Sequence, residues 1–140
     1  MTATGKMANE GNKFALELVL GIGSPSIPAN VYIGLATALV NEDSTLATIT
    51  ECTDAGYTRK EVTFDTPTEV GDAMLSASTN TLEFGAFTTG GTAITHAFLT
   101  DAVSGTSGKC LACFTLSATR YTNEGETLVI MPSNVTISYD

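Results

Sequence analysis

The sequence predicts an all-β protein, either an antiparallel β-sandwich or a jelly-roll-like domain, with one short helix near the N-terminus. Apolar and polar residues alternate with a period of two along most of the chain after residue 30. Turn signals recur about every 8 to 14 residues, as in sandwich domains. The 140 residues include 24 threonines, and a β-branched threonine suits a half-exposed pleated surface.

One helical pattern precedes the strands. Phe14 and Leu18 lie four residues apart within an apolar spacing that predicts a helix over residues 12–20, with these two side chains on its apolar face. Gly21 is expected to end the helix, because glycine readily adopts the left-handed conformation of a helix C-terminus.

The residues before this helix show no regular pattern. Residues 1–9 are therefore expected to form a flexible arm, and residues 10–140 a single domain. Asn9 or Asn12 is the expected helix cap, since a short polar side chain can accept a hydrogen bond from the first free amides.

The remaining pattern predicts seven or eight short strands and no tandem repeat. They are expected over residues 30–38, 46–51, 57–64, 81–87, 93–100, 109–118, 127–131 and 135–139. Helices do not alternate with these strands, which argues against a parallel α/β sheet.

Charge and composition exclude several classes of partner. The net charge is −9, from 15 acidic and 6 basic residues, so neither nucleic acid nor an anionic membrane is an expected partner. No stretch of about 18 apolar residues is present to span a membrane. The three cysteines give no closed disulfide framework, which favours a reducing compartment.

Two cysteines, Cys110 and Cys113, form a C-x-x-C motif. A zinc site would need two more ligands, and only Cys52 and His96 remain. The motif lies within an alternating run, which would place its two thiols on opposite faces of a strand. We therefore expect them to pack in the core, and we expect no metal and no cofactor.

The single histidine, His96, is the only candidate base for a catalytic triad. Its spacing predicts that it shares a strand face with Ile94 and Phe98, which favours a packing or interface role. The acidic residues fall mainly at turns, where carboxylates cap backbone amides, face water or bind calcium. No catalytic residue is expected.

Tyr57 and Arg59 project from the same face of a predicted strand that follows the turn at Asp54–Gly56. Gly56 is expected to provide a positive φ angle for this turn. Two interpretations are open: an internal lock on the loop 51–56, or a contact between subunits that shares ring stacking and guanidinium donors.

Several stretches, in this order, resemble a family of small tailed-phage structural proteins, which includes capsid decoration (cement) proteins and tail-fibre-like proteins. They are Pro28-Ala-Asn-Val-Tyr-Ile-Gly-Leu-Ala-Thr37, Glu51-Cys-Thr-Asp-Ala-Gly-Tyr-Thr-Arg-Lys-Glu-Val-Thr-Phe64, Ile94-Thr-His-Ala-Phe-Leu-Thr-Asp101, Gly125-Glu-Thr127 and Val135-Thr-Ile137. The similarity covers most of residues 10–140, although Cys52 stands where the family pattern has valine.

The resemblance implies a virion structural protein made in the bacterial cytoplasm. We expect a capsid decoration protein that binds the major capsid protein on the outer shell, as a homotrimer or other small homo-oligomer. The expected interface residues are Phe14, Leu18, Tyr57, Arg59 and His96. A tail-fibre or tail-tip module that contacts the host surface is the alternative, and a polysaccharide hydrolase is a third, less supported hypothesis.

Overall fold

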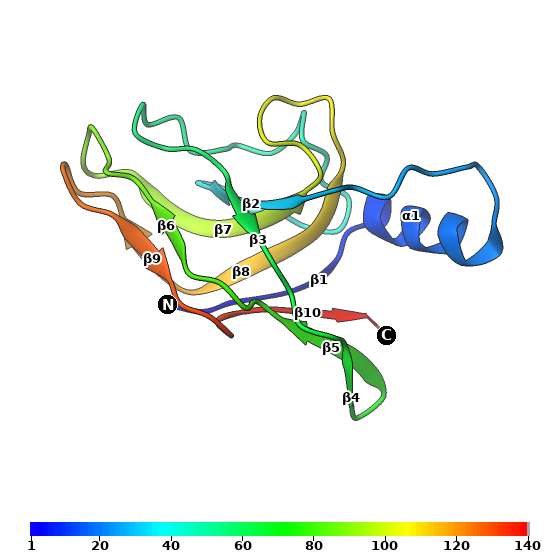
Figure 1. Ribbon diagram of the computed structural model, residues 1–140. Coiled ribbons are helices and arrows are strands. Elements are labelled where there is room, and N and C mark those ends of the chain that lie inside the picture. The colour runs from blue at the N-terminus through cyan, green and yellow to red at the C-terminus, as the bar shows by residue number, and fades with distance from the viewer. Residues whose placement is uncertain (140) are drawn as a thin grey trace.

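The computed structural model describes residues 1–139, which contain ten strands and one helix (Figure 1). In chain order these elements are β1 (Ala3–Met7), α1 (Asn9–Leu20), β2 (Val31–Ala36), β3 (Lys60–Val62), β4 (Thr68–Val70), β5 (Ala73–Ala77), β6 (Leu82–Phe84), β7 (Ala93–Thr100), β8 (Cys110–Tyr121), β9 (Leu128–Ile130) and β10 (Val135–Tyr139). The predicted all-β fold with one short N-terminal helix is confirmed. No helix in this part of the chain is long and apolar enough to cross a membrane.

Eight of the strands form one sheet in the order β3-β2-β7-β8-β1-β10-β5-β4, and β6 and β9 form a separate two-stranded ribbon. Every pair in the large sheet is antiparallel except β1 and β10, which run parallel. The sheet is therefore mixed, and the parallel pair arises because the N-terminal strand, which was not expected to take part, lies beside β10.

The large sheet curls until its two ends meet. Phe64, just beyond β3, forms an isolated antiparallel bridge with Ser78, just beyond β5. Backbone hydrogen bonds flank this bridge, from Asp65 N to Ala77 O at 2.9 Å and from Thr79 N to Thr63 O at 2.8 Å. The curl encloses the core on one face of the sheet.

The main core lies inside this curl. Its members are buried apolar side chains from both the large sheet and the ribbon: Ala3, Ile33, Leu35, Cys52, Val62, Leu82, Phe84, Phe87, Ile94, Ala97, Leu99, Leu111, Ala112, Phe114, Leu116, Ile130 and Val135. A second, smaller cluster lies on the other face of the sheet, beneath the loop 37–50, and contains Ala8, Ala36, Val40, Leu46, Phe98, Cys110 and Cys113. The loop therefore acts as a cover for the outer face of β2, β7 and β8.

The expected flexible arm is wrong for most of its length, because residues 3–7 form β1 inside the large sheet. Ala3 pairs with Leu116 of β8 on one side and with Val135 of β10 on the other. Gly5 lies against β8 so closely that a Cβ atom would collide with the carbonyl of Cys113. The strand has few apolar side chains. Pairing with β8 and β10, rather than a pattern of its own, therefore fixes its conformation.

Helix α1 begins three residues earlier than expected. Its N-cap is Ala8, whose side chain makes no capping bond, so neither Asn9 nor Asn12 has the predicted role. The amide of Asn9 instead donates to the Glu42 carbonyl at 2.9 Å. Gly21 ends the helix as expected, with φ 65° and hydrogen bonds to the Leu18 carbonyl from its own amide and to Glu17 from Ile22.

The strand expected over 46–51 is also wrong. Thr45 and Thr48 make local hydrogen bonds instead, including Thr45 N to Thr48 Oγ1 at 2.9 Å and Thr48 N to the Thr45 carbonyl at 3.0 Å. Such hydroxyls compete with strand pairing. Only Glu51 remains extended, in a single bridge with Ala36.

Candidate functional site

A buried arginine joins three loops at one end of the sheet. Arg59 donates from Nε to Glu51 Oε1 and from Nη2 to Glu51 Oε2, both at 2.8 Å. It also donates to the carbonyls of Ala102 and Gly105, at 2.9 and 2.8 Å. The Arg59 side chain is only 3% exposed, so these four acceptors compensate for its loss of water.

Tyr57 completes this network from the core side. Its hydroxyl donates to Glu51 Oε1 and accepts from the Leu35 amide, both at 2.8 Å, and its ring stacks on Phe84. Burial, and next the negative charge of Glu51, raise the pKa of the Tyr57 hydroxyl well above its usual range. The Glu51 hydrogen bond raises the pKa of Arg59, which stays a cation. The contacts of Tyr57 and Arg59 support the internal-lock interpretation.

Asp54 ties the same loop to the segment after β6. Its carboxylate accepts from the amides and the hydroxyls of Thr88 and Thr89, at 2.7 to 3.0 Å, and from the Gly56 amide at 2.7 Å. These donors, the Thr88 amide first, hold the pKa of Asp54 far below its usual range. Its carboxylate oxygens therefore have a structural use.

Gly56 is needed at this junction, but for a different reason from the predicted one. It does not have a positive φ angle. A Cβ atom on Gly56 would instead collide with the carbonyl oxygen of Ala86. Close approach of two backbones, rather than an unusual turn, excludes a side chain here.

His96 lies on the outer face of β7 and is half-buried. Its Nδ1 is 2.8 Å from the hydroxyl of Thr95, and burial lowers its pKa. The register between β7 and β8 shifts between Ile94 and His96, so Ile94 belongs to the main core and Phe98 to the outer cluster. The expected common face of Ile94 and Phe98 is therefore wrong. No carboxylate is within hydrogen-bonding distance of His96 among the described residues.

The two thiols of the C-x-x-C motif also differ from expectation. A register shift between Leu99 and Thr100 leaves Leu111 as an extra residue in β8, so Cys110 and Cys113 both join the outer cluster. Burial raises the pKa of Cys110 to about 12 and also raises that of Cys113. Both thiols are protonated and pack as small apolar groups.

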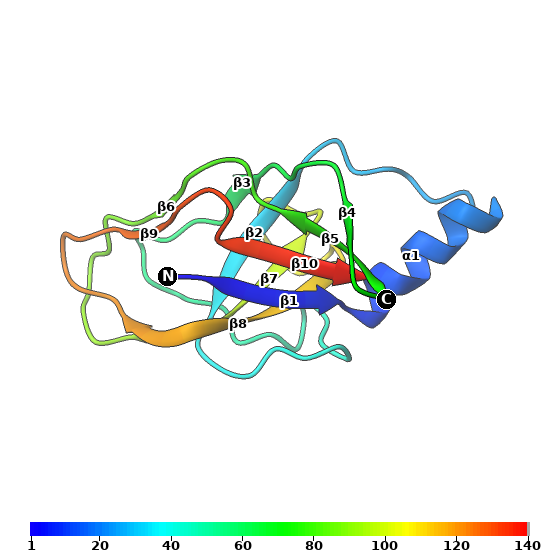
Figure 2. The same cartoon turned by 90° about the horizontal axis from the view of Figure 1, so that it is seen from below.

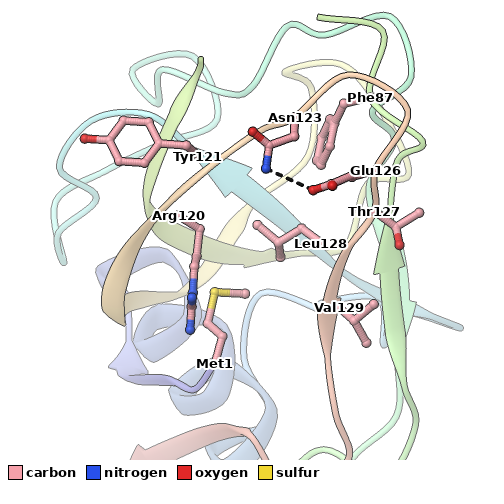
Figure 3. A pocket seen from close by; sticks show the side chains of 9 residues that line it. All are labelled: Met1, Phe87, Arg120, Tyr121, Asn123, Glu126, Thr127, Leu128 and Val129. Atoms are coloured by element: carbon pink, nitrogen blue, oxygen red, sulfur yellow. Dashed lines mark hydrogen bonds between the residues drawn. The ribbon is translucent and has the colours of Figure 1, made fainter. Parts of the chain in front are cut away.

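A surface pocket of about 300 Å³ lies between the end of β8 and β9 (Figure 3). Phe87, Leu128 and Met1 contribute apolar walls, and Arg120 and Glu126 contribute charge. Figure 3 shows Arg120 running alongside Met1, while Asn123 donates to Glu126 at 2.9 Å. Glu126 is the only acid among the lining residues, so the pocket offers no pair of carboxylates for hydrolysis.

Helix α1 projects from the end of the sheet, as both views of the fold show (Figures 1 and 2). Gly11 is its only buried residue within the described chain, and it packs against the Leu111 carbonyl at the start of β8. Phe14 lies on the same side, beneath the Lys109 ammonium at 5.6 Å from the ring centroid. Leu18, one turn further, is 39% exposed.

The helix and the segment after it also carry exposed apolar residues beyond Phe14 and Leu18. Leu16, Val19 and Leu20 are exposed, as are Ile22 and Ile27 in the segment that leads to β2. We call these five residues the apolar arm. The spacing of Leu16, Val19 and Leu20 by three and four residues was the signal in the sequence that could have identified them.

The structure thus divides the expected interface residues into separate places. Tyr57 and Arg59 meet at Glu51, His96 lies on the outer face of β7, and Phe14 and Leu18 lie on α1. No pair of acid and base suited to catalysis results from this arrangement.

The comparisons with known proteins agree with a structural role. A family model described as podophage GP4 fiber I protein gp80 matches residues 6–138. No curated protein matches the chain. The match extends from the end of β1 into β10 and includes the Glu51–Arg59 network, the apolar arm, the outer cluster and all of the main core except Ala3. The chain therefore belongs to the family of the podophage GP4 fiber I protein gp80 and is a structural protein of a phage virion.

Proposed function

We propose that the protein is a non-catalytic subunit of the phage fibre apparatus, held in place by burial of the apolar arm within the assembly. The observation that carries this proposal is the arm itself: Val19 is 82% exposed and Ile27 75% exposed. Several large apolar side chains exposed along one segment of the chain indicate an interaction site. The family of fibre proteins supports the placement.

The internal networks support a scaffold rather than an enzyme. The Glu51 and Asp54 carboxylates each accept at least three hydrogen bonds from neighbouring groups. Such groups stabilise loops and are poor general bases, since the hydrogen bonds that they accept occupy their lone pairs. Incubation with host surface polysaccharide should therefore release no sugar, and released sugar would contradict this part of the proposal.

A capsid decoration protein bound to the major capsid protein is the second candidate. It is supported by the resemblance of residues 28–37 and 51–64 to a family of phage structural proteins that includes capsid decoration proteins as well as tail-fibre-like proteins. In that case the arm would lie between the protein and the outer shell, and copies would form a homotrimer or another small homo-oligomer. The same surface would serve, but the position on the particle would differ.

Imaging of purified virions that carry a tagged copy of the chain decides between these positions. Label at the fibres supports the proposal, and label over the shell supports the decoration alternative.

A variant with Leu16, Val19 and Leu20 changed to glutamine is expected to fold and to be lost from the particle. Retention of this variant at full occupancy would exclude the arm as the attachment surface.

A further inference from the structure

Helix α1 has two apolar stripes, and only one of them faces the sheet. The first contains Phe14 and Leu18 on the side of Gly11. The second contains Leu16, Val19 and Leu20, which are 53%, 82% and 63% exposed. A surface helix normally keeps polar residues opposite its packed face. The second stripe is therefore an unfilled packing surface.

The exposed apolar area is large enough for a small protein interface. The segment after the helix adds Ile22 and Ile27, which are 55% and 75% exposed. The five side chains of the apolar arm expose on the order of 500 Å² together, near the upper end of what a monomer leaves uncovered. Burial of two such surfaces would total about 1,000 Å², which is the lower limit for a specific protein interface.

The distribution of charge indicates what covers the arm. The chain carries a net charge of −9, yet residues 18–41 include no Asp, Glu, Lys or Arg. Two copies of an acidic protein repel each other across most of their surfaces. They can approach closely through this uncharged segment, which contains all of the apolar arm except Leu16, whereas a basic partner would gain more by binding elsewhere.

We propose that the arm pairs with the arm of a second copy, so that Leu16, Val19 and Leu20 of each copy pack against the same residues of the other across a two-fold axis. This inference rests on the proposed function, since it names the occupant of the attachment surface. The modest area implies weak, concentration-dependent pairing of the free protein. In an assembly that holds many copies close together, the effective concentration would be higher and would favour the pair.

Sedimentation velocity over a series of concentrations tests the pairing. The wild-type chain is expected to pass from monomer to dimer, and L16Q/V19Q/L20Q to remain monomeric, with a dissociation constant raised by about tenfold or more. Glutamine preserves helix propensity. The matched control, L39Q/V103Q/M131Q, replaces residues that are 68%, 60% and 55% exposed elsewhere and should dimerise like the wild type.

A cysteine at position 19 tests the two-fold geometry. All three native cysteines are buried, so oxidation of V19C should yield a disulfide-linked dimer through the new thiol, and V103C should yield much less. A wild-type chain that stays monomeric, a trimer as the limiting species, or equal crosslinking of V103C would each overturn the proposal. If L16Q/V19Q/L20Q is lost from virions although the wild type is monomeric, the arm binds another virion protein. That result overturns self-pairing and leaves the proposed function standing.

Discussion

Arg59 and Glu51 form a side-on ion pair in which Nε and Nη2 each lie 2.8 Å from a different carboxylate oxygen. The guanidinium also lies over the ring of Phe98, 5.2 Å from its centroid. The same ring lies against Gly34, where a Cβ atom would collide with it. Arg59 thus connects the loop before β3, the loop after β7 and the outer cluster.

Replacement of Arg59 by methionine is expected to destabilise the fold strongly. The variant leaves Glu51 without its cation and two carbonyls without donors, at a cost of about 2–4 kcal/mol in the free energy of unfolding. Urea denaturation measures this cost. R120M is the matched control, because Arg120 is exposed, and it should change stability by less than about 0.5 kcal/mol. Equal effects of both variants would exclude the lock.

Asp54 predicts a specific loss of stability in acid. Its folded-state pKa is depressed, so its contribution is fully present above the pKa of about 3.9 of an unfolded aspartate and is lost as the pH falls below that value. D54N should be less stable than the wild type at pH 7, and the difference should shrink toward pH 2. Thermal unfolding at several pH values measures this, with D72N, an exposed acid near β5, as control. A pH-independent difference would contradict it.

Gly56 should not tolerate a methyl group. In G56A the new Cβ atom meets the backbone carbonyl of Ala86, and the Asp54 carboxylate holds the segment just after Ala86 through the amides of Thr88 and Thr89. We expect a loss of about 1–3 kcal/mol, as for other overpacked sites. G90A is the control, since a Cβ atom on Gly90 would make only ordinary contacts, the nearest at 3.4 Å. Comparable urea midpoints for the two variants would show that the close approach is not rigid.

The sequence predicted the regular parts of this structure well, because the signal there is local. The period of two along 93–100 and 135–139 gave β7 and β10, and Gly21 gave the end of α1. The missed parts depend on distant partners. β1 has little pattern of its own, and the shift at Leu111, which puts Cys110 and Cys113 in one cluster, is visible only in the pairing of β8.

In the candidate site, too, the local features could be predicted and the contacts between distant residues could not. Tyr57 and Arg59 could be selected from their spacing, but their acceptor, Glu51, lies in a region expected to be a strand. The predicted apolar face of α1 contained Phe14 and Leu18, whereas the exposed Leu16 and Leu20 on the other side of the helix were not predicted. Apolar residues lie on both sides of this helix, and only its packing against the sheet shows which side stays uncovered.

The native thiols are expected to be inert until the protein unfolds. All three cysteines are buried, and burial raises the pKa of Cys110 to about 12, so the reactive thiolate is scarce at neutral pH. A colorimetric thiol reagent at pH 8 should modify none of them in the folded chain and three in urea. V19C serves as the positive control, since its added thiol is exposed. Rapid labelling of the wild type would show that the outer cluster opens readily.

Deletion of residues 1–7 separates a structural strand from a flexible arm. β1 lies between β8 and β10, so its removal leaves the facing edges of both strands unpaired and opens the sheet at its centre. We expect the truncated chain to lose the cooperative unfolding transition. L16Q/V19Q/L20Q, altered only on the exposed stripe, should keep the wild-type melting temperature within a few degrees. Circular dichroism on heating measures both. A truncated chain that melts like the wild type would mean that β10 and β8 can pair without β1, and that residues 1–7 are a flexible N-terminal extension.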